Sequence, residues 1–393
     1  DIVPSYVDHL LSYIDTKEIA PLNIVANPGN GGAGPIVKEL AKHLPCHFTY
    51  LNDTPDGHFP NGVPNPLLVE NRDATSDAVR REGADLGIAW DGDFDRCFFF
   101  DENGRFIEGY YLVGLFASYF LKKHPGAKIL FDPRLIWNTE DIIAREGGYP
   151  VRCKSGHAFI KECMRREHVL YGGEMSAHHY FADFSYCDSG MIPWLLVISL
   201  MSTSGLSLAE MVDARIREYP CSGEINRKVG NADAIMESLS TRFKSGIQDR
   251  MDGLSVVYDE WRFNLRKSNT EPVVRLNVET RGDRELLEQK TRELLDLIQG
   301  EKAYGGSSMN VLVTGGAGYI GSHVIDDLIK SGYTPIVYDN FSTSHAEAVP
   351  ETVQLIQGDL HDFTFLKHIM GQYEIDAVLH FAASSQVGES MVD

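Results

Sequence analysis

The sequence predicts an α/β protein of several domains, and three observations lead to this prediction. The chain has 393 residues, whereas one hydrophobic core rarely serves more than about 250 residues. As far as about residue 221, apolar segments of strand length alternate with amphipathic segments of helix length, which is typical of mostly parallel sheets covered by helices. Beyond that point apolar and polar residues alternate, as in half-buried antiparallel strands.

The expected elements follow this change of pattern. Before residue 125 we expect helices at 6–14, 35–44 and 110–123, and strands at 22–26 and 86–90. The pattern restarts after Pro125-Gly126 with strands at 128–131 and 169–171 and a helix at 192–201. The third segment predicts strands at 256–258, 261–265 and 273–278, closed by a helix at 284–298.

Composition excludes several classes of function. The net charge of −20 disfavours nucleic acid and anionic membranes as partners. The longest apolar run, at 191–200, is too short to cross a bilayer, and the amino end does not resemble a signal peptide. The six cysteines are scattered without a C-x-x-C pair, which favours reduced thiols in a cytoplasmic protein.

A first candidate site is the run Asp91-Gly92-Asp93-Phe94-Asp95-Arg96, which directly follows a predicted strand. Carboxylates at alternate positions of a tight turn can converge on one hard cation, and the arginine beside them suits a phosphoryl group. The alternatives are an acidic surface turn or a partial calcium loop, although the positions of Phe94 and Arg96 do not fit a calcium loop of the EF-hand type.

A second candidate is the loop Gly172-Gly173-Glu174-Met175-Ser176-Ala177-His178, again after an apolar strand. Glu174 and Ser176 are two positions apart, so both can face a cleft and bind adjacent sugar hydroxyls. A solvated glutamate on a surface loop is the alternative.

A third candidate is Arg266-Lys267-Ser268-Asn269-Thr270-Glu271-Pro272, with Arg275 following. It combines guanidinium groups, hydroxyls, an amide and backbone N–H groups, which together suit a phosphate. It lacks the Gly-Lys-Ser/Thr of a Walker loop, and ordinary turn chemistry is the alternative. Lys154 and Arg134 supply further cations at predicted strand ends.

These three motifs resemble those of the α-D-phosphohexomutase superfamily, and of bacterial phosphomannomutases in particular, over about residues 1–303. The resemblance implies interconversion of mannose 6-phosphate and mannose 1-phosphate, or of glucose phosphates, through a phosphoserine and Mg²⁺. It implies domain 2 at 1–121, domain 3 at 122–222 and an α+β domain 4 at 223–303, the first two with mixed sheets and helices.

The resemblance also implies roles for particular residues. The expected metal ligands are Asp91, Asp93 and Asp95. The expected catalytic residues are Arg96, which faces the phosphoserine, with Lys154 and His178. The expected substrate-binding residues are Glu174 and Ser176 for the sugar hydroxyls and, for the phosphate, Arg134, Arg266, Ser268, Asn269, Thr270 and Arg275.

One part of the family pattern has no counterpart in the printed residues. The family's first domain carries a Thr-Ala-Ser-His-Asn-Pro-like loop with the phosphorylated serine, and the 393 residues contain no such loop. Because phosphoryl transfer needs donor and acceptor in line, we expect this chain alone to be inactive. A non-catalytic protein that binds sugar phosphate, Mg²⁺ or NAD is the alternative.

The last segment has a different composition, with two basic residues against eleven acidic ones from Met309 onward. A linker is expected at 300–308, its last part, 304–308, separating the domains. Strands at 310–314 and 335–338 then flank Gly315, Gly318 and Gly321 and a helix at 322–331, and Asp339 follows the second strand. Glycines for a tight turn and an acid for ribose hydroxyls predict a dinucleotide-binding unit.

This segment resembles the start of UDP-glucose 4-epimerases over residues 309–393. The resemblance implies NAD contacts at Gly315, Gly318, Gly321, Asp339, Asp359 and Leu360, but no epimerase catalysis, because the family's Tyr-x-x-x-Lys pair is not among the printed residues. About half of a Rossmann fold leaves an open sheet edge at 377–381. We therefore expect weak or absent NAD binding and a tail that is less stable than the rest.

Overall fold

The computed structural model describes residues 2–268, 273–304, 309–350 and 352–382. Contacts divide the chain into two compact units. One unit consists of Asp1–Lys228 and Met236–Glu293, and the other of Val229–Ile235 and Leu294–Asp393.

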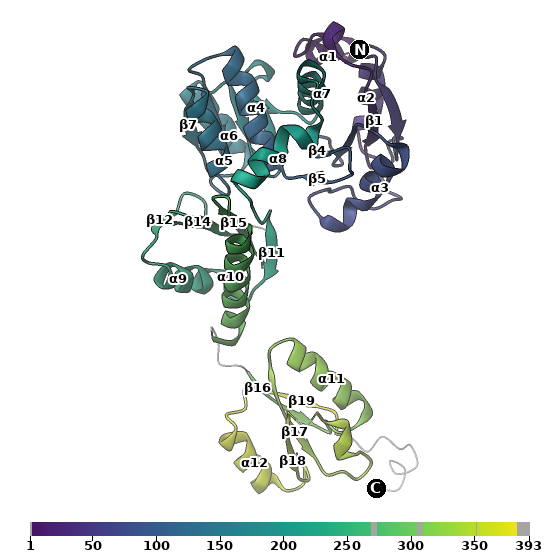
Figure 1. Ribbon diagram of the computed structural model, residues 1–393. Coiled ribbons are helices and arrows are strands. Elements are labelled where there is room, and N and C mark those ends of the chain that lie inside the picture. Colours follow the sequence, from purple (N-terminus) through teal and green to yellow (C-terminus); the bar gives the residue numbers. More distant parts are fainter. Residues whose placement is uncertain (1, 269–272, 305–308, 351, 383–393) are drawn as a thin grey trace. The chain divides into compact units, whose positions relative to one another are not determined.

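The first sheet of the larger unit has the strand order β2-β1-β3-β4-β5; Figure 1 labels β1, β4 and β5. Its strands are β1 (Asn23–Asn27), β2 (His47–Tyr50), β3 (Leu86–Trp90), β4 (Cys97–Phe100) and β5 (Phe106–Ile107). The accompanying helices are α1 (Val3–Leu11), α2 (Ala33–Ala41) and α3 (Asp73–Glu82). Ile24 of β1 packs with α2, whereas its neighbour Val25 packs with α3 on the other face. Both faces of β1 are covered, which is why its central residues Ile24, Val25 and Ala26 are all apolar.

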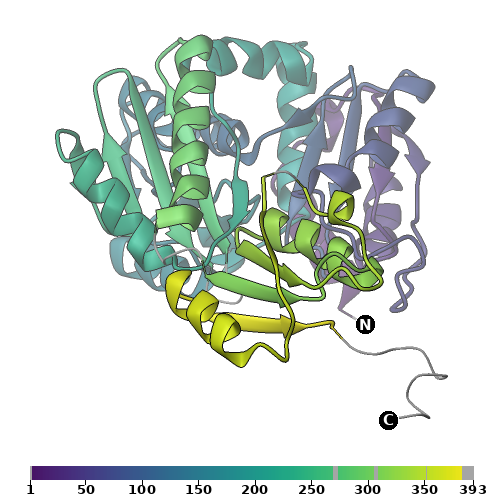
Figure 2. The same ribbon diagram turned by 90° about the horizontal axis from the view of Figure 1, so that it is seen from below.

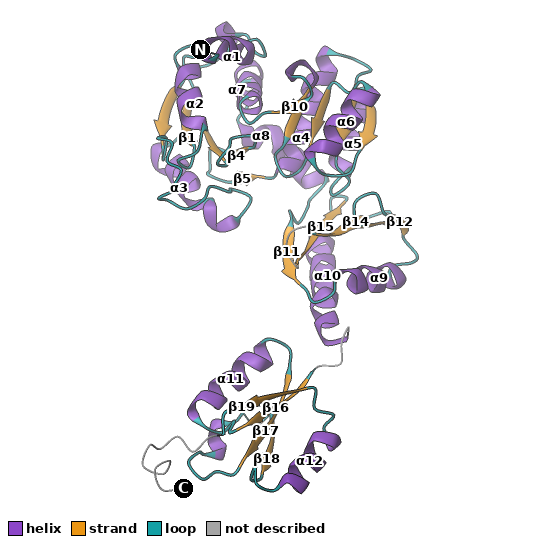
Figure 3. Cartoon of the chain, turned by 180° about the vertical axis from the view of Figure 1, so that it is seen from behind, coloured by secondary structure: helices purple, strands orange, loops and turns teal. Residues whose placement is uncertain are grey.

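The second sheet has the order β10-β9-β8-β6-β7. Its strands are β6 (Lys128–Phe131), β7 (Tyr149–Arg152), β8 (Tyr171–Gly173), β9 (His179–Phe181) and β10 (Cys187–Asp188). Helices α4 (Gly109–Lys123), α5 (Trp137–Arg145) and α6 (His157–Glu167) lie beside these strands (Figure 3). The chain continues through α7 (Ile192–Ser204) and α8 (Leu208–Glu218).

The third sheet is antiparallel, with the order β11-β15-β14-β13-β12. Its strands are β11 (Ile225–Lys228), β12 (Ile247–Asp249), β13 (Leu254–Val257), β14 (Trp261–Lys267) and β15 (Val273–Thr280), with helices α9 (Ala232–Arg242) and α10 (Arg284–Tyr304). Arg266 of β14 is the direct partner of Arg275 of β15. Directly opposite residues of an antiparallel pair point to the same face, so this register places the two arginines side by side.

A buried carboxylate joins the third sheet to the segment after β6. Glu279 of β15 is fully buried and accepts hydrogen bonds from the backbone N–H groups of Ile136 (2.8 Å) and Trp137 (3.3 Å). It also accepts from the Tyr110 hydroxyl and forms a 2.7 Å ion pair with Arg262 of β14.

The smaller unit contains a fully parallel sheet with the order β18-β17-β16-β19. Its elements are β16 (Asn310–Thr314), α11 (Tyr319–Lys330), β17 (Thr334–Asp339), β18 (Gln354–Gln357), α12 (Phe363–Gln372) and β19 (Ala377–His380). Ile325 of α11 packs on one face and Ile369 of α12 on the other, and Figure 1 shows these helices on opposite sides of the sheet. A short connection joins α12 to β19, both yellow in Figure 2. This is the fold of a partial Rossmann unit, as predicted.

Two expectations need correction. The residue pattern favoured mostly parallel sheets, whereas the first two sheets are mixed, as the family resemblance implied, because the short connection between β3 and β4 allows only an antiparallel pair. The expected linker at 300–308 is also partly wrong, since α10 continues to Tyr304; residues 305–308 lie outside the described part.

Within the described ranges no single helix is long and apolar enough to cross a membrane. The bent pair α7 and α8 meets the criteria of length and composition only when both helices are taken together.

Candidate active site

The acidic motif forms the turn between β3 and β4. Phe94 at its centre has a φ of 51°, in the left-handed region that a bulky residue rarely adopts. The turn after β1 lies directly against it, because the Gly32 N–H donates to the Gly92 carbonyl over 3.0 Å. A Cβ atom at Gly31 would lie 2.5 Å from that carbonyl oxygen. Glycine at this position thus permits the close approach that holds the acidic turn.

The three aspartates of this turn have carboxylate oxygens within 4.8 Å of one another. Asp91 is buried and both its oxygens accept hydrogen bonds from Arg96, at 2.7 Å and 3.2 Å. Asp93 is exposed, and Oδ1 of Asp95 is buried without a hydrogen-bond partner among the described residues. Burial, together with the neighbouring carboxylates, raises the pKa of Asp95 to about 6, even though His178 acts in the opposite direction. Hard oxygen ligands with one unsatisfied atom fit Mg²⁺.

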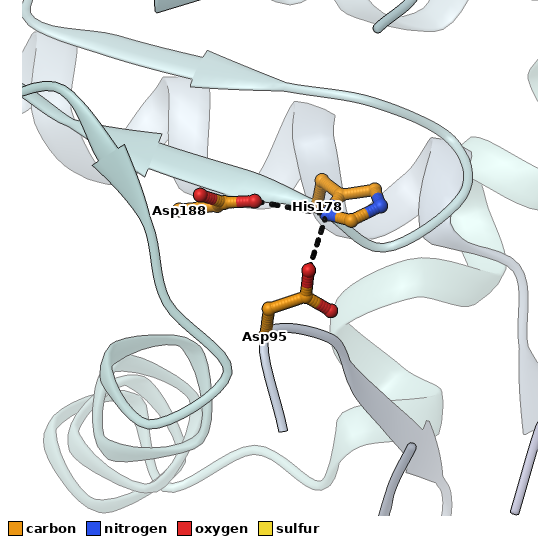
Figure 4. Close-up of side chains that lie close together, drawn as sticks. All are labelled: Asp95, His178 and Asp188. Carbon is orange, nitrogen blue, oxygen red and sulfur yellow. Dashed lines mark hydrogen bonds and ion pairs between the residues drawn. The ribbon is translucent and has the colours of Figure 1, made fainter. Parts of the chain in front are cut away.

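His178 lies between this turn and β10 (Figure 4). Its Nδ1 is 3.2 Å from Oδ2 of Asp188 and 3.7 Å from Oδ2 of Asp95. Lys161 of α6 pairs with the other oxygen of Asp188 at 2.8 Å. Burial alone would lower the pKa of His178, but the hydrogen bond to Asp188 and the nearby carboxylates of Glu174 and Asp95 raise it overall. These carboxylates therefore stabilise the protonated imidazole relative to an imidazole in water.

The main chain also connects the first two motifs. Arg96 and His178 form an isolated antiparallel bridge, and the Trp90 indole donates to the Gly190 carbonyl over 2.8 Å. The acidic turn and the second candidate loop are thus adjacent in space.

Glu174 in the second loop is almost completely buried. Its Oε2 accepts from the Tyr180 hydroxyl at 2.7 Å, and its Oε1 from the Gly156 N–H at 3.2 Å. Ser176 is partly exposed and its Oγ accepts from Nη2 of Arg134 at 3.1 Å. The sequence alternative of a solvated glutamate is therefore wrong.

Arg134 is buried at the end of the segment after β6. Asp132 holds it through contacts of 2.8 Å to Nε and 3.1 Å to Nη2. The same carboxylate accepts from the Met175 N–H at 2.8 Å. Despite its burial, the pKa of Asp132 is lowered by Arg134 and these hydrogen bonds. Arg134 is thus a fixed cation.

The arginine motif brings two more guanidinium groups to Arg134. Arg266 and Arg275 each approach Glu224, which also contacts Nη1 of Arg134. Nε of Arg266 and Nε of Arg275 are buried and have no hydrogen-bond partner in the described part of the chain. Unsatisfied buried donors next to a cationic cluster are suited to an anion such as phosphate.

The remaining predicted residues of this site have different environments. The Ser268 N–H bonds to the Val273 carbonyl at 2.9 Å, at the start of the loop. Asn269 and Thr270 lie outside the described residues. Lys154 is exposed, with its ammonium group 5.1 Å from the centre of the Phe159 ring.

Sequence reasoning missed three acidic residues of this region: Asp132, Asp188 and Glu224. Asp132 was recognisable, since an acid two positions before Arg134 is visible in the sequence. Asp188 had no such signal, because its role depends on the pairing of β10 with β9.

In the smaller unit, the predicted acid Asp339 is mostly buried at the end of β17. It accepts from the N–H groups of Ala317 (3.0 Å) and Phe341 (2.9 Å) and from the Ser344 hydroxyl (2.8 Å). A Cβ at Gly315 would lie 2.5 Å from the Ala382 nitrogen. A Cβ at Gly321 would lie equally close to the Gly315 carbonyl, whereas at Gly318 the nearest atom is 3.3 Å away.

The two other expected NAD contacts lie after β18. Asp359 accepts from the Asn340 side chain at 3.0 Å, and Leu360 packs against the core around Tyr338. The Asp339 carboxylate, by contrast, accepts from the three donors described above. Since a carboxylate has about four acceptor sites, Asp339 can accept from about one further donor.

Comparison with known proteins identifies the larger unit. Residues 4–104, 108–219 and 224–296 match the family models for domain II, domain III and the C-terminal domain of phosphoglucomutase/phosphomannomutase. A phosphomannomutase of Escherichia coli is 56% identical over 306 residues, covering 76% of this chain and 67% of that protein. The chain belongs to the phosphoglucomutase/phosphomannomutase family.

Other members of this family show similar coverage. Phosphohexose mutases of Xanthomonas campestris are 60% identical over 298 residues, or 75% of this chain and 66% of the relative. The chain thus spans about two thirds of the length of these phosphohexose mutases. A solved structure of a family protein from Burkholderia thailandensis has a TM-score of 0.67 at 28% identity and covers 76% of this chain and 65% of its own.

The smaller unit matches a different family model. Residues 312–393 match GDP-mannose 4,6 dehydratase. The narrower resemblance to an epimerase stays a prediction, as does NAD binding.

Proposed function

We propose that the larger unit provides the metal-binding, sugar-binding and phosphate-binding parts of a phosphomannomutase, which interconverts mannose 6-phosphate and mannose 1-phosphate. The observation that supports this proposal is that direct contacts link the three motifs in space. The acidic turn pairs with His178 through Arg96, and Ser176, two residues before His178, contacts Arg134. A hexose bisphosphate with one phosphate near Asp95 and the other near the arginines would contact all three motifs.

Each group has a specific task in this proposal. Asp91, Asp93 and Asp95 would hold Mg²⁺, which supplies positive charge to a phosphoryl group in transfer. Ser176 and Glu174 would bind sugar hydroxyls, and Arg134, Arg266 and Arg275 would bind the phosphate that does not react. His178, which is hydrogen-bonded to Asp188, can donate a proton to the reacting oxygen.

The phosphoryl donor is the part that the printed residues do not supply. The relatives of this chain are named for a mutase reaction, and we propose that turnover depends on a phosphoserine domain of the family type. The smaller unit is proposed to bind a dinucleotide weakly, through the turn at 315–321 and Asp339.

Calorimetry with mannose 1-phosphate tests the phosphate assignment. Replacing Arg266 by Ala removes a charge-assisted contact and should weaken binding by about 1.5–3 kcal/mol. Replacing Arg250 by Ala is the matched control, because this exposed arginine of the same unit pairs with Glu237. Unchanged affinity in Arg266→Ala would show that the phosphate binds elsewhere.

A further inference from the structure

We propose that Glu224 limits the affinity of the three arginines for phosphate, because its carboxylate competes for the same guanidinium groups. This inference rests on the proposed function, which assigns phosphate to Arg134, Arg266 and Arg275. In addition, Glu224 would allow the bound phosphate to dissociate more readily, because it weakens phosphate binding.

Glu224 is the point where the three arginines meet. Its Oε2 lies 3.2 Å from Nη1 of Arg134 and 3.4 Å from Nη2 of Arg266. Its Oε1 lies 3.4 Å from Nη1 of Arg275. Although burial alone would raise the pKa of Glu224, the arginines lower it, Arg134 most strongly. The carboxylate is therefore ionised and acts as an internal anion.

The lengths of these contacts indicate that they are exchangeable. Charge-assisted N–H···O bonds are typically about 2.7–2.9 Å long, and the bond from Arg134 to Asp132 is 2.8 Å. All three contacts of Glu224 are longer. Asp132 is thus the firm partner of Arg134, whereas Glu224 makes weaker contacts that a phosphate oxygen can replace.

One carboxylate also leaves part of the cluster unused. Nε of Arg266 and Nε of Arg275 are buried without a partner in the described ranges. A phosphate has more acceptor oxygens than a carboxylate and can reach additional donors. The phosphate therefore gains contacts that Glu224 does not make, but the negative charge of Glu224 reduces its electrostatic attraction to the arginines.

The charge balance gives the direction of the effect. Arg134, Arg266 and Arg275 face the carboxylates of Asp132, Glu174 and Glu224. Asp132 and Glu174 also accept hydrogen bonds from Met175 and Tyr180. Removal of the Glu224 charge leaves the three arginines with one carboxylate fewer, which strengthens phosphate binding. If Glu224 instead served to align the arginines, its removal would weaken binding.

The test uses calorimetric titration of the full chain with inorganic phosphate and with mannose 1-phosphate. Glu224→Gln keeps the shape of the side chain and removes its charge. We expect Glu224→Gln to bind about tenfold more tightly, which corresponds to about 1.4 kcal/mol. Glu224→Asp should give a smaller gain, because its shorter side chain keeps the negative charge but places it further from the arginines. Glu237→Gln is the matched control, since Glu237 pairs with Arg250 on an exposed surface, and should leave the affinity unchanged.

The Arg266→Ala variant distinguishes an error in the phosphate assignment from an error in the role proposed for Glu224. Weaker binding in Arg266→Ala together with tighter binding in Glu224→Gln supports both. Weaker binding in Arg266→Ala with equal or weaker binding in Glu224→Gln overturns the role of Glu224 alone. Unchanged binding in Arg266→Ala overturns the phosphate assignment itself.

Discussion

Replacing Glu279 by Gln should destabilise the larger unit strongly. In the described structure, each oxygen of the Glu279 carboxylate is approached by two hydrogen-bond donors. Oε1 accepts from the Ile136 N–H and from Arg262, and Oε2 accepts from the Trp137 N–H and the Tyr110 hydroxyl. Whichever way a glutamine amide is oriented, its NH₂ group faces two donors and can accept from neither.

The size of the effect follows from the burial of the ion pair. The side chains of Arg262 and Glu279 are 2% and 0% exposed. Removing one partner of a buried pair typically costs about 3–5 kcal/mol, because the other charge remains buried without compensation. Urea denaturation followed by tryptophan fluorescence measures this loss, since Trp137 lies next to the network and Trp261 on β14 next to Arg262.

A control and a second variant define the outcome. Glu260→Gln makes the same change at an exposed position near Trp261 and should alter the free energy of unfolding by less than about 0.5 kcal/mol. Arg262→Met combined with Glu279→Gln should recover part of the loss, because no charge then remains unpaired. A loss below about 1 kcal/mol in Glu279→Gln would refute the view that this network stabilises the unit.

Three further predictions concern activity, pH and the segment between α10 and β16. The printed chain alone should not convert mannose 1-phosphate in a coupled assay with Mg²⁺ and a bisphosphate activator; turnover would reveal another phosphoryl donor. Burial, with a contribution from His178, lowers the pKa of His179 to about 3, whereas an unfolded histidine has a pKa of about 6.5. Below about pH 6.5 the unfolded chain therefore binds a proton that the folded chain does not, so stability falls toward about pH 3; urea titrations should show that His179→Phe loses this component. Limited proteolysis should cut first at the Gly-Gly-Ser-Ser run at 305–308 and leave a fragment that ends just after α10, near residue 304, identified by mass spectrometry; a first cut within the larger unit would contradict the predicted order of stability.

Much of the fold was accessible from the sequence because its strands are bounded by clear turn signals. The strands at Leu86–Trp90, Lys128–Phe131 and Asn310–Thr314 were predicted with the bounds that the structure has. The direction of the strands in the first two sheets was less accessible. A turn of six residues after β3 was interpreted as a metal loop, although its shortness also requires an antiparallel return.

The candidate site was predictable where one short segment carries several functional groups. The acidic turn, the Glu174–His178 loop and the paired arginines are such segments. Partners that come from distant segments had no local signal. Asp188 meets His178 only through the pairing of β10 with β9, and Glu224 meets Arg134 only because β11 joins the third sheet.

The separation of these contacts along the chain has a consequence for folding kinetics. Arg134 and Glu224 are 90 positions apart, and Arg262 reaches the Pro133 carbonyl across 129 positions. Contacts across such long loops form slowly, because the entropy of loop closure must be overcome first. Interactions that are absent from the transition state change the unfolding rate and hardly affect the folding rate. A phosphate bound at the arginines should therefore slow the unfolding of the chain and lengthen the lifetime of the folded state, while leaving the folding rate almost unchanged.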